Sequence, residues 1–229
     1  MKKITVTVFA ALFLLTFSSI QAQTTMSFGG NGGLNISNAT FNPDLPTNQS
    51  KSSRTGFRIG GVAEFSFIPM LALQVEPTFL TGGTQVSGPL FYDANTGQIV
   101  NGNITYKTTY FQLPILLKFK VPVAGPVSPY VLAGPNLGFI MSAKELDEPS
   151  GGYQSSESDF KDQLKTLDFA LNFGAGVGFS VVPGTTITVD FRYSLGLSDI
   201  SSDKGKQQNG GRSIKTTGFQ ILAGVLFGI

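Results

Sequence analysis

The sequence predicts an all-β protein: an eight-stranded antiparallel up-and-down transmembrane β-barrel. Three observations indicate this fold: stretches in which apolar and polar residues alternate, connections that are alternately short and long, and an N-terminus typical of exported chains. Successive side chains of a strand point to opposite faces of its sheet, so each alternating stretch predicts a strand with one apolar face and one polar face. Residues 186–197, TITVDFRYSLGL, give the clearest example.

The N-terminus predicts that the chain is exported. A basic start, Met-Lys-Lys, precedes an apolar stretch over residues 4–20, and small residues follow, as in secretory signal peptides. We therefore expect a signal peptide over residues 1–22 and an outer-membrane β-barrel domain over residues 23–229. An uncleaved helical anchor is the alternative, but this apolar stretch is at the short limit for spanning a bilayer.

The composition favours a barrel over a helical membrane protein. Hydrophobic residues make up 41% of the chain and charged residues 13%, yet no apolar run of membrane-helix length follows the N-terminal stretch. A barrel places its apolar residues at every second position instead. Without the two lysines of the expected signal peptide, the 16 basic residues become 14 and balance the 14 acidic ones, so the charge does not indicate nucleic acid as a partner.

Eight strands are expected in order along the chain: residues 26–37, 55–67, 71–81, 106–121, 128–142, 167–181, 186–197 and 216–227. The first is rich in glycine and alternates least, whereas the other seven each place apolar residues on one face. In order, these faces carry Phe57, Ile59 and Phe65; Leu71, Leu73 and Val75; Phe111, Leu113 and Ile115; Val131, Leu137 and Phe139; Phe169, Leu171 and Phe173; Ile187, Val189 and Phe191; and Phe219, Ile221 and Val225.

Three prolines fall inside the expected strands. Pro77, Pro114 and Pro135 cannot donate a hydrogen bond to a neighbouring strand, and proline in a sheet is confined to edges, strand ends and bulges. We therefore expect bulges or local strand boundaries at these positions.

The connections between the expected strands alternate in length. Three are short and contain proline, at residues 68–70, 122–127 and 182–185. Outer-membrane barrels have short periplasmic turns and longer extracellular loops, so the alternation predicts an even number of strands and both ends in the periplasm. The four long polar connections, expected as extracellular loops, are residues 38–54, 82–105, 143–166 and 198–215.

The polar faces carry charges of both signs, which favours a barrel over a secreted antiparallel sandwich, the alternative all-β fold. An eight-stranded barrel has an interior just wide enough for side chains. We therefore expect a neutral lumenal charge network that fills the barrel and leaves no open pore. Its expected members are Arg58, Glu64, Glu76, Lys118, Lys120, Asp168, Asp190 and Arg192.

No residue pattern indicates an enzyme, a cofactor or a metal. The chain has no histidine, the usual general base near neutral pH, and no cysteine. The inward carboxylates have basic partners that would neutralise them. The acidic third loop leaves open a divalent-cation or partner site, although it lacks the spacing of a calcium loop. The basic fourth loop leaves open a contact with the third loop or with lipopolysaccharide phosphates.

Four motifs carry a family resemblance: GGLNIS at 32–37, FQLPILLK at 111–118, PYVLAGP at 129–135 and GAGVGF at 174–179. Together they resemble the PorT-like outer-membrane barrel proteins of Gram-negative bacteria, over essentially the whole mature chain. The resemblance implies a porin-like barrel in the outer membrane, and it accounts for two of the strand prolines. The named member of that family is linked to type IX protein secretion, so the resemblance also implies such a link. The motifs consist of scaffold residues and imply no functional site.

The sequence thus predicts a non-enzymatic integral outer-membrane barrel with a side-chain-filled lumen and four long extracellular loops. The expected role is structural or interactive, in the cell envelope. The expected partners are the lipid bilayer, lipopolysaccharide, and secretion or envelope proteins, without nucleic acid. A narrow channel for small solutes is the alternative function.

Overall fold

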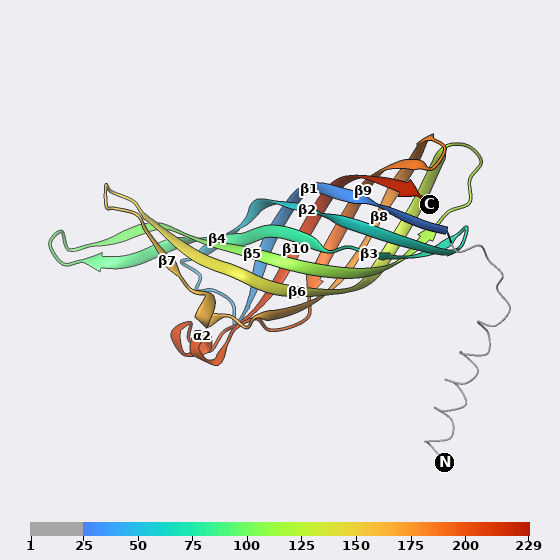
Figure 1. The fold of residues 1–229 in the computed structure, drawn as a ribbon. Helices are drawn as coiled ribbons and strands as arrows, with labels where there is room; N and C mark the ends of the chain where they lie inside the picture. Colours follow the sequence, from blue (N-terminus) through green and yellow to red (C-terminus); the bar gives the residue numbers. More distant parts are fainter. Residues whose placement is uncertain (1–24) are drawn as a thin grey trace, which may run out of the picture.

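The computed structural model describes residues 25–229, and the expected signal peptide lies outside them. The described strands form one antiparallel sheet, which the pairing of its first and last strands closes into a barrel (Figure 1). β3 and β4 lie end to end between β2 and β5, so together they fill one position in the ring. The short β7 pairs only with β6 and is not part of the ring. The described ring therefore contains eight strand positions, as predicted. The strands are β1 (Thr25–Asn42), β2 (Ser50–Ile68), β3 (Leu71–Val75), β4 (Thr78–Asp93), β5 (Gln98–Lys120), β6 (Val127–Pro149), β7 (Ser156–Asp159), β8 (Leu167–Val182), β9 (Thr185–Gly196) and β10 (Ser213–Gly228).

The three strand prolines lie at interruptions of the sheet. Glu76 and Pro77 separate β3 from β4, and the β5–β6 pairing is interrupted between Pro114 and Leu117, beside Pro135. A hydrogen bond still crosses the first gap, because the Glu76 N–H donates to the Pro114 carbonyl at 3.0 Å. The expected boundary is therefore confirmed at Pro77, whereas at Pro114 and Pro135 the strands continue and only the pairing between them is interrupted.

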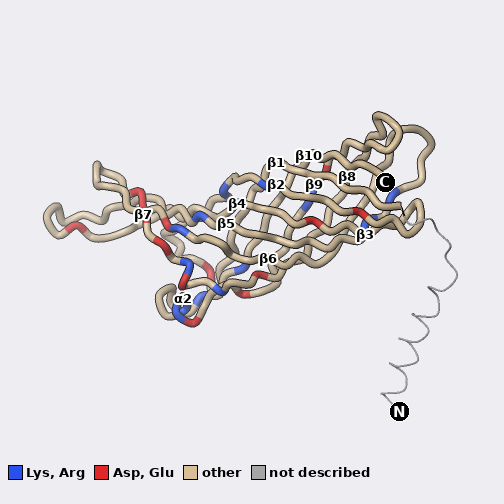
Figure 2. The backbone as a smooth tube through the Cα atoms, in the orientation of Figure 1, with Lys and Arg blue, Asp and Glu red and all other residues tan. Residues whose placement is uncertain are grey.

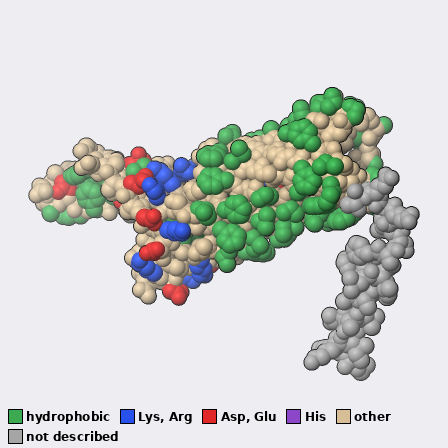
Figure 3. Space-filling view, viewed as in Figure 1, with side chains coloured by type: hydrophobic (Ala, Val, Ile, Leu, Met, Phe, Trp, Pro, Cys, Tyr) green, Lys and Arg blue, Asp and Glu red, His purple; other side chains and the backbone are tan. Residues whose placement is uncertain are grey.

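The predicted apolar faces point outward. Phe191 and Phe219, for example, are 63% and 61% exposed, although large apolar side chains are normally buried in a soluble protein. Figure 3 shows hydrophobic side chains over the barrel wall, with the charged side chains concentrated beyond one end of it. An apolar band around a closed sheet is the surface that a lipid bilayer requires. No described helix is long and apolar enough to span a membrane.

The two ends of the barrel differ. One end, here called the turn end, carries the connections at residues 69–70, 121–126 and 183–184, which matches the predicted short turns. The other end, here called the hairpin end, carries the longer excursions, and the β4–β5 hairpin projects far beyond the barrel (Figure 1).

The prediction of a long loop over residues 82–105 was wrong. Nearly all of it is strand, with a turn at residues 94–97, and β6 likewise continues through the expected third loop to Pro149. Backbone pairing needs no apolar face, and a hairpin that leaves the membrane loses the alternation from which strands are recognised. The alternation of apolar and polar residues therefore marks where the apolar barrel wall ends, not where the strands end.

The third and fourth connections pack on each other at the hairpin end. They contain the short 3₁₀ helix η1 (Lys161–Gln163) and the six-residue helix α2 (Asp203–Gln208). Leu164 and Ser201 form a backbone bridge, and the Ser202 hydroxyl donates to the Asp162 carbonyl at 3.0 Å. Of the two contacts that the sequence left open for the fourth connection, the one with the third connection is therefore present.

Candidate functional site: the barrel lumen

Glu76 is the centre of a charged group inside the barrel. It is fully buried at the gap between β3 and β4. Its Oε2 accepts hydrogen bonds from Arg58 and from Arg192 Nη1, the latter at 2.6 Å. Its Oε1 accepts from Arg192 Nη2 at 3.0 Å, from Asn31 at 3.2 Å and from Gln74. The paired Arg192 contacts are the geometry in which a guanidinium binds a carboxylate most specifically.

Glu64 forms a second charged group nearer the turn end. Lys118 and Lys120 lie 2.8 and 2.5 Å from its two carboxylate oxygens. The Lys118 ammonium also donates to Gln74 Oε1 at 3.2 Å, and Gln74 in turn donates to Glu76. Gln74 therefore joins the two groups into one network.

Asp190 completes the network from the opposite side of the barrel. It accepts a hydrogen bond from Arg192 at 2.9 Å and another from the Tyr130 hydroxyl. The Tyr130 ring also lies 3.8 Å from the Lys118 ammonium, at cation–π distance. Charged positions lie on the barrel strands as well as on the connections (Figure 2). We call the set the lumenal charge cluster: Arg58, Glu64, Glu76, Lys118, Lys120, Asp190 and Arg192.

Gly176 on β8 makes room for this cluster. A Cβ at this position would lie 2.3 Å from Asp190 Oδ1 and 2.7 Å from the ring of Tyr130. The inward glycines of the predicted sixth strand therefore leave space for larger side chains opposite, and at Gly176 that space is taken by Asp190 and Tyr130.

Asp168 corrects the expected eight-residue network. It is buried, but its carboxylate accepts hydrogen bonds from Ser198 at 2.7 Å and Thr216 at 2.8 Å, not from a basic residue. Asp190 pairs with Gly176, eight residues along β8 from Asp168, or roughly 26 Å at about 3.3 Å per residue. Alternation assigns a residue to a face but not to a height in the barrel. Without Asp168, four basic and three acidic residues leave the cluster with a formal charge of +1, not the expected neutrality.

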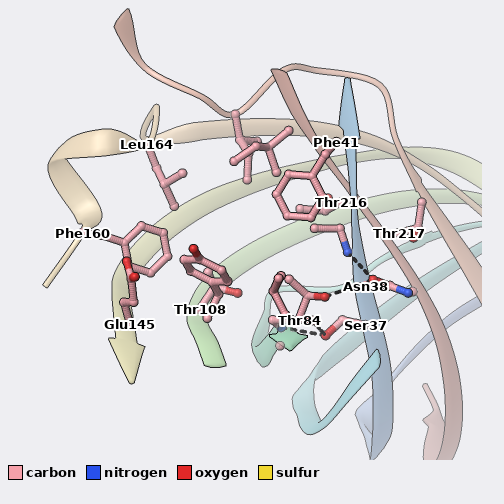
Figure 4. A pocket seen from close by; sticks show the side chains of 18 of the residues that line it. Ser37, Asn38, Phe41, Thr84, Thr108, Glu145, Phe160, Leu164, Thr216 and Thr217 are labelled. Carbon is pink, nitrogen blue, oxygen red and sulfur yellow. Dashed lines mark hydrogen bonds between the residues drawn. The ribbon is translucent and has the colours of Figure 1, made fainter. Parts of the chain in front are cut away.

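A cavity of about 450 Å³ lies between the cluster and the hairpin end. One side is apolar, because the cavity borders a buried cluster that includes Leu80, Phe160, Leu164 and Ile200. The other side is largely polar and uncharged. Figure 4 shows Phe160 and Leu164 on one side, and Ser37, Asn38, Phe41, Thr216 and Thr217 on the other.

The sequence did not predict this cavity. Phe160 and Leu164 fall in the acidic third connection, interpreted as a solvated loop, yet both turn inward and are buried. The available signal was two large apolar residues four positions apart in an otherwise polar segment. One acidic residue, Glu145, also lines the cavity, and burial together with nearby Asp147 raises its pKa.

The described residues contain no group of three or more acidic, histidine or cysteine side chains placed to hold a metal ion. The acidic third connection instead uses its carboxylates in surface contacts. Glu157 lies 2.8 Å from Lys144 and 3.2 Å from Lys107, and Asp162 lies 3.4 Å from Lys204.

The closed β-sheet, its outward-facing apolar wall and its buried polar lumen together define an integral outer-membrane β-barrel protein. The chain belongs to the family described as "Outer membrane protein beta-barrel domain", whose model matches residues 21–202. The protein is accordingly located in the outer membrane. This family is broader than the PorT-like group, so membership of that group stays a prediction.

Several solved structures are similar to this chain. Neisserial surface protein A is 14% identical to it, and the alignment covers 87% of this chain and 96% of the Neisserial chain, with a TM-score of 0.43. OprG from Pseudomonas aeruginosa is 10% identical, and the alignment covers 91% of this chain and 99% of OprG, with a TM-score of 0.47. Ail of Yersinia pestis, solved with a heparin analogue, is 16% identical, and the alignment covers 88% of this chain and 99% of Ail, with a TM-score of 0.37. No curated protein matches the sequence.

Proposed function

We propose that this protein is a non-enzymatic outer-membrane barrel whose lumen is closed by the lumenal charge cluster. The observation that supports this most strongly is the convergence of buried side chains from separate parts of the wall. Arg58 on β2 and Arg192 on β9 both bind Glu76, and all three are buried. Opening a pore through this point would separate ion pairs in a low-dielectric interior, which costs several kcal/mol.

The cluster is suited to packing and not to acid–base catalysis. Each of its carboxylates is already bound to a basic side chain: Glu64 to Lys118, Glu76 to Arg58 and Asp190 to Arg192. A general base must be free to accept a proton from a substrate.

Exposed parts of the hairpin end supply the candidate interaction surfaces. At the tip of the β4–β5 hairpin, Phe91, Tyr92 and Ile99 are exposed, and Tyr153 packs edge-on against Phe91 with ring centroids 5.4 Å apart. Exposed aromatic residues of this kind favour contact with another envelope or secreted protein. A link to type IX secretion rests on the PorT-like resemblance alone.

Lipopolysaccharide is the second proposed partner. Charged side chains cluster directly beyond the apolar wall at the hairpin end (Figure 3). Lys144 and Lys107 both pair with Glu157, and the exposed Lys144 ammonium has three donors, so it can bind a lipid phosphate as well as Glu157.

Planar-bilayer recording distinguishes the closed barrel from the alternative, a narrow solute channel. For the closed barrel we expect no stable single-channel steps from purified refolded protein, with a known porin as the positive control. Stable steps whose size changes in Arg58→Ala or Asp190→Ala would instead establish the channel.

A further inference from the structure

The cavity at the hairpin end is bounded by specific contacts, not by a chance gap between loops. Its volume of about 450 Å³ is in the range of about 300–1,000 Å³ typical of small-molecule sites. Gln220 lines its floor and accepts a hydrogen bond from Arg58 of the lumenal charge cluster at 3.2 Å. In its cover, Gly205 of α2 packs so closely that a Cβ there would lie 2.2 Å from the Gln163 carbonyl oxygen. The floor and the cover of the cavity are therefore both held in place by these contacts.

One side of the cavity would pack against an apolar group. Leu80, Phe160 and Leu164 line it, and the Tyr106 ring meets Phe160 edge-on with centroids 5.4 Å apart. Water beside such side chains is readily displaced by a hydrocarbon or aromatic group, because transfer of apolar surface out of water is favourable.

The polar side contains a buried side-chain oxygen that lacks a hydrogen-bond partner. Within the described chain, Gln112 Oε1 is buried and has no hydrogen-bond partner, and Gln112 lines the cavity from the inner face of β5. A buried polar group without a partner is costly. The hydroxyl group of a ligand can donate a hydrogen bond to this oxygen.

The lining is unsuited to a charged ligand. Its charged residues are Glu145 and Arg212, one of each sign, and the Arg212 guanidinium already donates to the Asn209 carbonyl at 3.0 Å. The remaining polar lining consists of amides and hydroxyls, including Ser37, Thr84 and Thr108. Because these two residues carry opposite charges, the lining as a whole favours neither a cation nor an anion.

We propose that this cavity binds an uncharged amphipathic small molecule, with its apolar part against Phe160 and Leu164 and a hydroxyl group at Gln112. The site is separate from the hairpin-tip and lipopolysaccharide surfaces. It lies on the hairpin-end side of the charge cluster, so binding requires no passage through the barrel.

The test uses a fluorinated probe and the full mature protein in lipid nanodiscs. A trifluoromethyl-phenylbutanol is titrated while its ¹⁹F NMR signal is followed, with empty nanodiscs as the control for partition into lipid. We expect saturable binding of the alcohol. The matching butylbenzene, without a hydroxyl, and the matching phenylbutanoate, with a charge, should bind at least about tenfold more weakly.

Three variants locate the binding. Thr108→Trp fills the cavity and should abolish saturable binding, whereas Thr109→Trp places the same side chain on the opposite face of β5 and should retain it. Gln112→Leu should lower the affinity of the protein for the alcohol to its affinity for the butylbenzene. Heat-modifiable migration on a gel confirms that each variant is folded. No saturable binding by the folded native protein, or equal binding by Thr108→Trp, would overturn the proposal that this cavity is the binding site.

Discussion

Glu76→Gln should lower the free energy of unfolding by about 3–5 kcal/mol. The change keeps the shape of the side chain and removes the carboxylate charge that Arg58 and Arg192 share in the barrel interior. Asp190 still binds Arg192, but Arg58 is left buried with no carboxylate in contact. The cost arises from that uncompensated guanidinium and not from a lost surface ion pair, which would contribute only about 0–1 kcal/mol.

The measurement is urea unfolding in lipid vesicles, followed by circular dichroism because the chain has no tryptophan. Asp44→Asn, at an exposed site between β1 and β2, serves as the matched carboxylate control and should change stability by less than about 0.5 kcal/mol. Arg58→Gln combined with Glu76→Gln should recover part of the loss, because it removes the unpaired cation. A loss below about 1 kcal/mol for Glu76→Gln alone would show that water reaches these groups.

Gly176→Ala should lower stability by about 1–3 kcal/mol through overpacking of the lumen. The added methyl group would meet Asp190 Oδ1 at 2.3 Å and the Tyr130 ring at 2.7 Å, and neither can withdraw without breaking the hydrogen bond between them. Urea unfolding under the same conditions measures the effect.

Gly61→Ala is the matched control, because the nearest atom to its new methyl group, Pro77 Cγ, is 3.8 Å away. Its effect should stay below about 0.5 kcal/mol. In a Tyr130→Ser background the cost of Gly176→Ala should fall, because most of the colliding ring is gone. Equal costs in both backgrounds would place the strain elsewhere.

The sequence predicted the barrel wall because lipid and lumen impose opposite demands on neighbouring residues. Phe191 and Arg192 are adjacent in β9, yet one is 63% exposed on the apolar wall and the other is buried against Glu76. That contrast repeats around the ring, so the outward and inward faces follow from the alternation of apolar and polar residues, and the strand number follows from it together with the connection lengths. The inward orientation of all the predicted lumenal residues follows in the same way.

What alternation leaves undetermined is position along the barrel. Asp168 and Asp190 share a face, but only the register of β8 with β9 separates them by eight residues. Outside the membrane the contrast disappears, so residues 82–105 gave no strand signal although they form a paired hairpin. The inward turn of Phe160 and Leu164 depends on contacts with the fourth connection, which no local pattern contains.

Cysteine labelling tests the closed lumen most directly, because the native chain has no cysteine. Thr216→Cys lines the cavity on one side of the lumenal charge cluster, and Ser128→Cys lines the lumen at the turn end, beyond it. Each variant is reconstituted into sealed vesicles in mixed orientation and treated from outside with a small, charged thiol reagent that cannot cross lipid.

With a closed lumen, each cysteine is reached only in molecules whose corresponding end faces outward. The two labelled fractions should therefore add up to the whole population, and detergent should bring each variant to complete labelling. Complete labelling of both variants in intact vesicles would mean that the reagent passes the cluster, and would contradict the closed barrel.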